Sequence, residues 1–243
     1  MTLEYETIDG DLFAYESEES IKEKAKLKYQ LYLVHSGIPE FYWNINFEDY
    51  KGDKENKEYL YIKYYANNCH TKEFNHVHLF LHGNHSCQKS ALMYNICKQA
   101  IENGMKVKTI LAATLIDKLM KLQGFNFIQE IYNEIQELKN CDLIAIDDGF
   151  DVEKAMHWNG VNKNLIISEW DQFFREVLAS NTKIIMTSNY DKNNIGQQFG
   201  KSILELIDRN FFSVHLTESI KELRQYNVAK VFENMDKEEK RKS

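Results

Sequence analysis

The stretch LHGNHSCQKSAL, residues 81–92, decides the fold of this chain. It follows the apolar run HVHLF and places four residues between Gly83 and a Gln-Lys-Ser triplet. A phosphate-binding loop has Gly, four residues, then Gly-Lys followed by Ser or Thr, so Gln88 stands where the second glycine belongs. Because glycine takes positive φ angles without steric cost, the stretch indicates either a nucleotide site with an altered loop or a coincidental match.

Strand-like and helix-like segments alternate along the chain from about residue 76. The apolar, β-rich runs lie at residues 76–83, 106–112, 142–150, 183–190 and 212–216. Helical patterns lie between them, at residues 90–104, 115–124, 127–140, 168–180 and 202–211. Several of the strands are apolar on both faces, which is typical of a parallel sheet covered by helices. The sequence therefore predicts an α/β fold, with two further helices at 19–37 and 56–69 and an extended aromatic segment at 38–50.

Three of the predicted strands end in chemically useful side chains. The first leads through Gly83 into the Lys-Ser pair, the second ends at Asp147 and Asp148, and the third ends in Thr-Ser-Asn at Asn189. Each piece alone is weak, because an acidic turn or a Thr-Ser-Asn turn is ordinary loop chemistry. Parallel neighbouring strands would bring all three ends to one edge, where α/β sheets bind ligands. Together they predict a nucleoside triphosphate site.

Each of these residue types has a role in such a site. Lys89 would contact the β and γ phosphates, and the Ser90 hydroxyl would coordinate Mg²⁺. Asp147 would hold Mg²⁺ directly or through water, and Asp148 would orient or deprotonate the attacking water. Asn189 would position that water or contact the γ phosphate. Backbone N–H groups of the loop and the helix start would bind phosphate oxygens. The predicted nucleotide-binding loop residues are Gly83, Asn84, His85, Ser86, Cys87, Gln88, Lys89, Ser90 and Ala91.

Composition limits the other possibilities. The formal net charge of -7 argues against a protein that binds nucleic acid mainly through a broad basic surface of its own. No apolar run approaches the roughly 18 residues of a membrane helix. The four cysteines contain no Cys-x-x-Cys pair, and nothing in the sequence is typical of a secretory signal. We therefore expect a cytoplasmic protein that makes no membrane contact.

Four stretches resemble one family, the AAA+ ATPases of the bacterial replicative-helicase loader group of the DnaC, DnaI and IstB type. SGIPEFYWNINFEDY is similar to the segment before the family's ATPase core, and LIAIDDGF to its Walker B strand. IIMTSN resembles sensor 1, and LELIDRNFFSVHLTESIK the end of the core. The resemblance covers about residues 35–225. It implies an AAA+ P-loop NTPase core with a short N-terminal helical extension, and binding of ATP or ADP with Mg²⁺.

The resemblance also implies roles for two basic residues. Arg209 would be an arginine finger that reaches a neighbouring subunit's site in a homo-oligomer, although it would equally form a surface ion pair with Glu205. Lys221 aligns with the nucleotide-binding sensor 2 arginine, and lysine keeps the charge without the planar fork. Ser86 and Gln88 replace two glycines of the family's loop, Gly-x-x-Gly-x-Gly-Lys-Thr. These departures concern γ-phosphate handling and imply an ATPase with slow hydrolysis.

The expected organisation is a helicase-binding N-terminal helical segment at residues 1–36, an AAA+ core at 37–230 and a disordered charged tail at 231–243. The expected function is ATP-dependent loading of a hexameric replicative helicase onto single-stranded DNA during DNA replication. The short N-terminal region is similar in style to loaders carried by phages or mobile elements. Two alternatives stay open, an IstB-like transposition regulator and a nucleotide-binding pseudo-ATPase adaptor. There are also candidate contacts to single-stranded DNA, and the alternative is that these lysines lie on solvated faces and do not contact DNA. They are Lys106, Lys108, Lys118 and Lys121.

Overall fold

The computed structural model describes residues 3–8, 11–123, 128–150 and 163–217. Its centre is a five-stranded sheet in the order β4-β5-β6-β3-β7, and every neighbouring pair is parallel. The predicted α/β fold with a parallel sheet is therefore confirmed. The strands are β3 (His78–Gly83), β4 (Val107–Leu111), β5 (Leu143–Asp147), β6 (Lys183–Ser188) and β7 (Phe211–Leu216).

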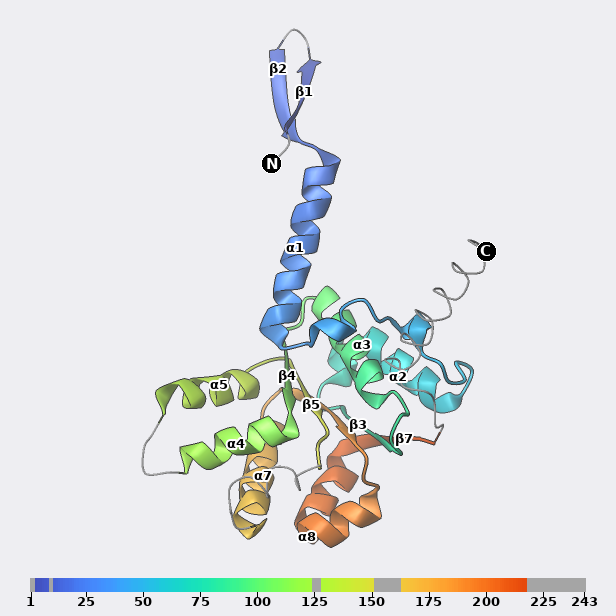
Figure 1. Cartoon of the computed structure of the whole chain (residues 1–243), viewed down its shortest axis with the longest axis vertical. Coiled ribbons are helices and arrows are strands. Elements are labelled where there is room, and N and C mark those ends of the chain that lie inside the picture. The colour runs from blue at the N-terminus through green and yellow to red at the C-terminus, as the bar shows by residue number, and fades with distance from the viewer. Residues whose placement is uncertain (1–2, 9–10, 124–127, 151–162, 218–243) are drawn as a thin grey trace, which may run out of the picture.

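Helices cover both faces of the sheet (Figure 1). One hydrophobic core lies under α2 (Lys57–Asn68) and α3 (Lys89–Glu102). A second core on the other face is covered by α4 (Ala112–Leu122), α5 (Gln129–Lys139), α7 (Lys163–Leu178) and α8 (Lys192–Asn210). The second core is dominated by fully buried aromatic side chains, which include Phe80, Phe150, Trp170, Phe173 and Phe174. Burial on both faces fixes the strands that carry the site.

The N-terminal region projects away from this body. Helix α1 (Glu18–Ser36) begins at Ser17, whose side chain accepts a hydrogen bond from the Ser20 N–H, and it ends at Gly37 with φ 75°. Strands β1 (Leu3–Ile8) and β2 (Asp11–Glu16) form an antiparallel hairpin ahead of α1. Figure 1 shows α1 standing clear of the sheet with the hairpin at its far end. The sequence pattern predicts the helix and gives no signal for the hairpin.

The expectation of an extended segment at residues 38–50 is wrong. The chain there forms two short 3-10 turns, η1 (Glu40–Tyr42) and η2 (Phe47–Asp49). The second turn is closed by a capping box between Asn46 and Asp49. Aromatic residues favour strands only where a neighbouring strand is available, whereas here a side chain of α3, described below, satisfies the backbone carbonyls.

Helix α7 is described from residue 163, five residues before the predicted start at 168.

A third short turn, η3 (Lys72–Phe74), connects α2 to the sheet. Within the part of the chain that the structure describes, none of the helices combines the length and apolarity that a membrane span requires.

Candidate nucleotide site at the carboxyl edge of the sheet

The three predicted strand ends meet at one edge of the sheet. Strands β5, β6 and β3 are consecutive and parallel, so their carboxyl ends lie side by side. The loop after β3 leads directly into α3, whose first residue is Lys89. The Ser90 hydroxyl donates a hydrogen bond to Asp147 Oδ1 at 2.7 Å, and the Thr187 hydroxyl donates to the same oxygen at 2.5 Å. Side chains from the other two segments, Ser90 and Thr187, therefore converge on the Asp147 carboxylate at the end of β5.

The Asp147 carboxylate is held by hydroxyl groups. Its second oxygen, Oδ2, accepts a hydrogen bond from the Tyr94 hydroxyl at 3.3 Å. Asp147 is only 7% exposed, so these donors replace water around a buried charge. Burial, and then the neighbouring Asp147 charge, raise the pKa of Tyr94 far above its ordinary value, so the phenol keeps its proton. Tyr94 therefore acts as a hydrogen-bond donor at every physiological pH.

Lys89 lies folded back over its own loop. Its ammonium donates hydrogen bonds to the Gly83 carbonyl at 3.0 Å and to the Asn84 carbonyl at 2.6 Å. Burial lowers the pKa of Lys89, and the nearby charges of Asp148 and Asp147 oppose that shift. A phosphate in the loop would offer this lysine a stronger, charged acceptor than the two carbonyls.

The two substituted positions of the loop have backbone angles that favour glycine. Ser86 has φ 66° and Gln88 has φ 58°, both in the region that favours glycine. A non-glycine residue there costs on the order of 1 kcal/mol or more. Gly83 is required for a different reason, since a Cβ at its position would lie 2.0 Å from the Leu216 carbonyl oxygen. The chain thus holds the loop geometry at the two altered positions in spite of backbone strain.

The remaining predicted loop residues differ in exposure. Asn84 and His85 are exposed, whereas Cys87 and Ala91 are buried. The Cys87 thiol lies 3.9 Å from the His85 carbonyl oxygen. The two exposed residues form the rim of the loop.

The turn after β5 places Asp148 beside β6. Asp148 has φ 54°, and its N–H donates to the Thr187 hydroxyl at 3.0 Å. The next residue must be glycine, because a Cβ on Gly149 would lie 2.4 Å from the Met186 side chain. Asn189 follows β6 directly and is half-buried. Asp148 thus follows Asp147 in the turn after β5, and Asn189 follows the neighbouring strand β6.

Arg209 lies at the opposite edge of the sheet. Helix α8 starts after the carboxyl end of β6 and returns to the amino end of β7, and Arg209 is two residues before that strand. A six-residue strand spans about 17 Å, so Arg209 is distant from Asp147 of its own chain. Its side chain is 77% exposed and lies 3.4 Å from Glu205, the surface pair considered above. A catalytic role for Arg209 therefore requires a second subunit.

The residues at this edge fit a magnesium nucleotide. Among the described residues, no group of three or more His, Cys, Asp or Glu side chains is arranged to hold a metal. Mg²⁺ characteristically uses one or two carboxylates together with phosphate oxygens and water. The hydrogen-bonded pair of Ser90 and Asp147, next to a loop in glycine-like conformation, offers that hard-oxygen donor set.

Three of the lysines considered as DNA contacts are neutralised by local carboxylates. Lys108 pairs with Glu137 at 2.8 Å, Lys121 pairs with Asp117 at 2.6 Å, and Lys118 pairs with Glu134. These contacts favour solvated faces over a DNA-tracking groove. Lys221 and the tail at 231–243 lie outside the described residues.

Sequence reasoning missed two residues of α3 that shape the site. Tyr94 contacts the Asp147 carboxylate, and Lys98 fixes the segment at 38–50. Both are buried side chains with a polar group, on a helix whose other buried residues are mostly apolar. Tyr94 and Lys98 are four residues apart, and Tyr94 comes five residues after Lys89. This spacing is the signal in the sequence that places both residues on the helix that follows the loop.

Comparisons with known proteins identify the relatives of this fold. No family model matches the chain. Two curated proteins described as replicative helicase loader DnaC, from Buchnera aphidicola subsp. Acyrthosiphon pisum and subsp. Schizaphis graminum, are each 28% identical over 232 residues. The match covers 90% of this chain and 87% of each relative. The chain resembles the replicative helicase loaders.

Solved structures support the fold of this loader-like chain. A crystal structure of the DnaC helicase loader has a TM-score of 0.55 and 16% identity, covering 73% of this chain and 99% of that one. The replication initiator DnaA bound to AMPPCP and single-stranded DNA has a TM-score of 0.56 and 15% identity, covering 72% of this chain. This chain spans half the length of that DnaA chain. The core therefore has the AAA+ ATPase fold.

Proposed function

We propose that this protein is an ATP-dependent loader that places a hexameric replicative helicase on single-stranded DNA during DNA replication. The observation that carries the proposal is the convergence of Ser90 and Thr187 on the buried Asp147 carboxylate, below a loop with glycine-like backbone angles. The likeness to proteins named helicase loader over 90% of the chain supports the loading role. The structural neighbour DnaA binds AMPPCP and single-stranded DNA, which supports both ligands here.

The chemistry follows from residues of this chain. Lys89 would leave the Gly83 and Asn84 carbonyls and pair with the β and γ phosphates. Ser90 and Asp147 would hold Mg²⁺, which neutralises phosphate charge when it is bound. Asp148 would accept a proton from, or orient, the attacking water.

Two polar groups would complete the site around the γ phosphate. Asn189 would hold the attacking water from the end of β6, and Lys221 would contact the phosphate from the C-terminal region. Arg209 would stabilise the transition state of a neighbouring subunit, which makes hydrolysis dependent on a homo-oligomer. Its position at the far edge of the sheet is consistent with action in trans only.

Helix α1 is the proposed contact with the helicase. Leu27, Leu31 and Val34 follow one helix face at a spacing of four and three residues, and each is more than half exposed. Leu31 also lines a groove between α1, the start of β4 and α5. An exposed apolar face beside a groove is typical of a protein–protein contact. We call α1 and the hairpin before it the arm. A loader with this arm would keep its helicase contact apart from its nucleotide site.

A binding-only adaptor is the second candidate, and the position of Lys89 favours it. The lysine is already satisfied by two loop carbonyls, and the loop carries strain at Ser86 and Gln88. Such a protein would bind nucleotide without useful turnover. It would still use α1 to contact its partner, so partner binding alone does not separate the two candidates.

The test is helicase loading onto circular single-stranded DNA with purified cognate helicase. We expect loading with the wild type and ATP, and loss of loading with Lys89→Ala. Arg209→Ala should keep ATP binding and lose turnover, because it removes only the neighbour's contribution. Loading that persists without ATP, or in Lys89→Ala, would support the adaptor. A wild type that shows no association with the helicase would contradict both candidates.

A further inference from the structure

The segment between α1 and α2 packs along one stripe of α3. We call residues 38–51 the aromatic segment. The aromatic segment contacts Gln88, which is the N-cap of α3, and three residues of the helix itself, Ala91, Tyr94 and Lys98. These four residues are three or four positions apart, so they lie on one face of the helix. The same helix begins with Lys89 and Ser90 at the nucleotide site. One face of α3 therefore holds the aromatic segment, and its first turn faces the proposed phosphates.

Gln88 joins the loop to the end of the aromatic segment. Its side-chain Oε1 accepts a hydrogen bond from the Lys51 N–H at 3.2 Å. The residue does so from φ 58°, an angle that a glycine would adopt without strain. A glycine has no side chain to reach Lys51. The glutamine at this position thus provides a contact that the glycine of an ordinary phosphate loop cannot make.

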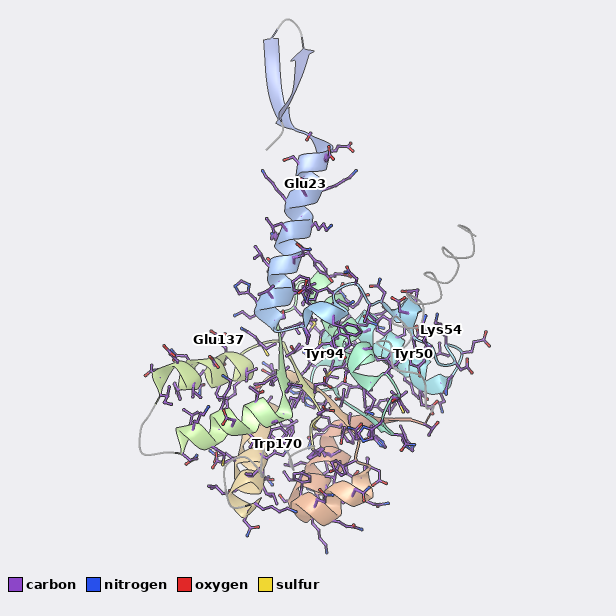
Figure 2. All side chains as sticks on the ribbon, viewed as in Figure 1. Glu23, Tyr50, Lys54, Tyr94, Glu137 and Trp170 are labelled. Carbon is purple, nitrogen blue, oxygen red and sulfur yellow. The ribbon has the colours of Figure 1, made fainter. Side chains whose placement is uncertain are left out.

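Tyr94 joins the carboxylate of the site to the middle of the aromatic segment. Its hydroxyl donates to Asp147 Oδ2 at 3.3 Å. Its ring packs against the Tyr42 ring, with centroids 4.5 Å apart and planes tilted by 33°. Figure 2 shows Tyr94 inside the body of the protein, whereas Glu23 stands on the projecting part of α1. A movement of the Asp147 carboxylate would therefore reach Tyr42 through one side chain.

Lys98 holds the aromatic segment on α3 independently of the site. Its ammonium donates to the carbonyls of Tyr42 at 2.9 Å, of Trp43 at 3.4 Å and of Ile45. The Tyr42 carbonyl also accepts a hydrogen bond from the Ile45 N–H at 3.3 Å. Burial lowers the pKa of Lys98, and the nearby charges of Glu102 and Asp49 oppose the shift. The Lys98 contact would keep the segment on α3 when the hydrogen bonds of Gln88 and Tyr94 break.

We propose that Gln88 and Tyr94 are positioning residues that fasten the aromatic segment to the nucleotide site. Metal at Asp147 would compete with the Tyr94 hydroxyl for the carboxylate, and phosphate in the loop would engage the backbone at Gln88. Either event loosens the segment, and α1 continues directly from it through Gly37 and Ile38. The arm is thereby held in a way that depends on nucleotide. The nucleotide-dependent part of this inference rests on the proposed function.

The first test measures hydrogen exchange of the amides of residues 41–51 in the full chain without nucleotide. Gln88→Asn keeps a residue that tolerates positive φ but shortens the side chain, so the Lys51 amide should exchange about fivefold faster. Tyr94→Phe keeps the ring against Tyr42 and removes the hydroxyl, so exchange near Tyr42 should rise by a similar factor. The matched control is Tyr65→Phe, which removes a tyrosine hydrogen bond to the Val77 carbonyl instead.

Tyr65→Phe should leave exchange of residues 41–51 at the wild-type rate. Wild-type rates in both Gln88→Asn and Tyr94→Phe would overturn the proposal, because the two ties would then hold nothing. So would equal acceleration in Tyr65→Phe, which would show a general loss of stability. These outcomes do not depend on nucleotide, so they remain decisive even if the chain does not bind ATP.

The second test adds ATP and Mg²⁺, with binding followed separately by calorimetry. The wild type should show faster exchange in residues 41–51 on binding. Tyr94→Phe, measured at an ATP concentration that calorimetry shows to be saturating for that variant, should show little further change, since its hydrogen bond to Asp147 is already lost. An unchanged segment in a wild type that binds ATP would overturn the coupling. A wild type that fails to bind ATP would instead contradict the proposed function.

Discussion

The carboxyl edge of the sheet and the projecting arm are built in opposite ways. At the sheet edge, Asp147 is buried and accepts hydrogen bonds from three side chains on two elements that are far apart in sequence, α3 and β6. On the arm, α1 packs only its last turns against the body, through Leu33 and Tyr29, and exposes its apolar face. Residues at the edge are fixed by tertiary contacts, whereas the apolar side chains Leu27, Leu31 and Val34 on the arm are exposed. The contrast separates buried residues, whose loss should affect stability, from exposed residues, whose loss should not.

The largest stability effect is expected in the body. Trp170 is fully buried among Phe150, Phe173 and Phe174. Trp170→Ala should lower the free energy of unfolding by about 3–5 kcal/mol, because it removes a large apolar side chain and leaves a cavity. Urea denaturation followed by circular dichroism measures this loss. A decrease below about 1 kcal/mol would show that the aromatic core is not close-packed.

The next effect is a loss of stability in acid. Burial, and then the charges of His76 and Lys183, lower the pKa of His78 to about 4. Burial, and then the charge of His215, lower the pKa of His82 to about 4, with Lys192 and Lys89 acting in the same direction and Asp191 opposing them. Both imidazoles are neutral in the folded state and bind protons near pH 6.5 when unfolded. Stability is therefore intact above pH 6.5 and falls as the pH drops toward 4.

Between pH 7 and pH 5, each histidine should lower the free energy of unfolding by up to about 2 kcal/mol. Melting temperatures at pH 7.5, 6.0 and 5.0 measure the effect. His82→Phe should flatten the profile, because its ring would keep the stacking on His215 and Phe80 without a titrating nitrogen. A wild-type profile that does not fall between pH 7 and 5 would contradict the burial of both rings.

A smaller effect is expected in the loop itself. Ser86→Gly should raise the free energy of unfolding by about 1 kcal/mol, since glycine removes the strain of φ 66°. Gln88→Gly should give a smaller gain, because relief of strain at φ 58° is offset by loss of the contact with Lys51. Chemical denaturation of both variants beside the wild type checks the difference. A larger gain for Gln88→Gly would show that the Lys51 contact contributes nothing.

The smallest stability effect is expected on the arm. Leu27→Ala should change the free energy of unfolding by less than about 0.5 kcal/mol, because Leu27 is 59% exposed. On the proposed function it should weaken association with the helicase, which sedimentation or surface-immobilised binding would measure. Lys22→Ala on the same helix, at an exposed pair with Glu18, is the control and should leave association unchanged. Unaltered binding in Leu27→Ala would remove this helix face from the contact.

The sequence predicts the sheet edge better than the arm, for a physical reason. The strands ending at Gly83, Asp147 and Ser188 are apolar on both faces and end in polar residues, so pattern alone places their ends together. The turns at 38–50 are not predicted, because they depend on Lys98, a single side chain distant in sequence. The hairpin ahead of α1 is not predicted, because its pairing is local and its sequence shows no pattern of a buried face. Tyr94 is missed because it lies on a helix and its partner, Asp147, lies at the end of a strand that is distant in sequence.

Calorimetric titration of ATP with Mg²⁺ into the whole chain tests whether this edge of the sheet is a nucleotide site. We expect saturable binding to the wild type, and loss of that binding in both Lys89→Ala and Asp147→Ala. Trp170 and the rest of the core are untouched in these variants, so circular dichroism should show an unchanged fold. Equal binding by the wild type and Lys89→Ala, or no binding by a folded wild type, would contradict a nucleotide site at this edge of the sheet.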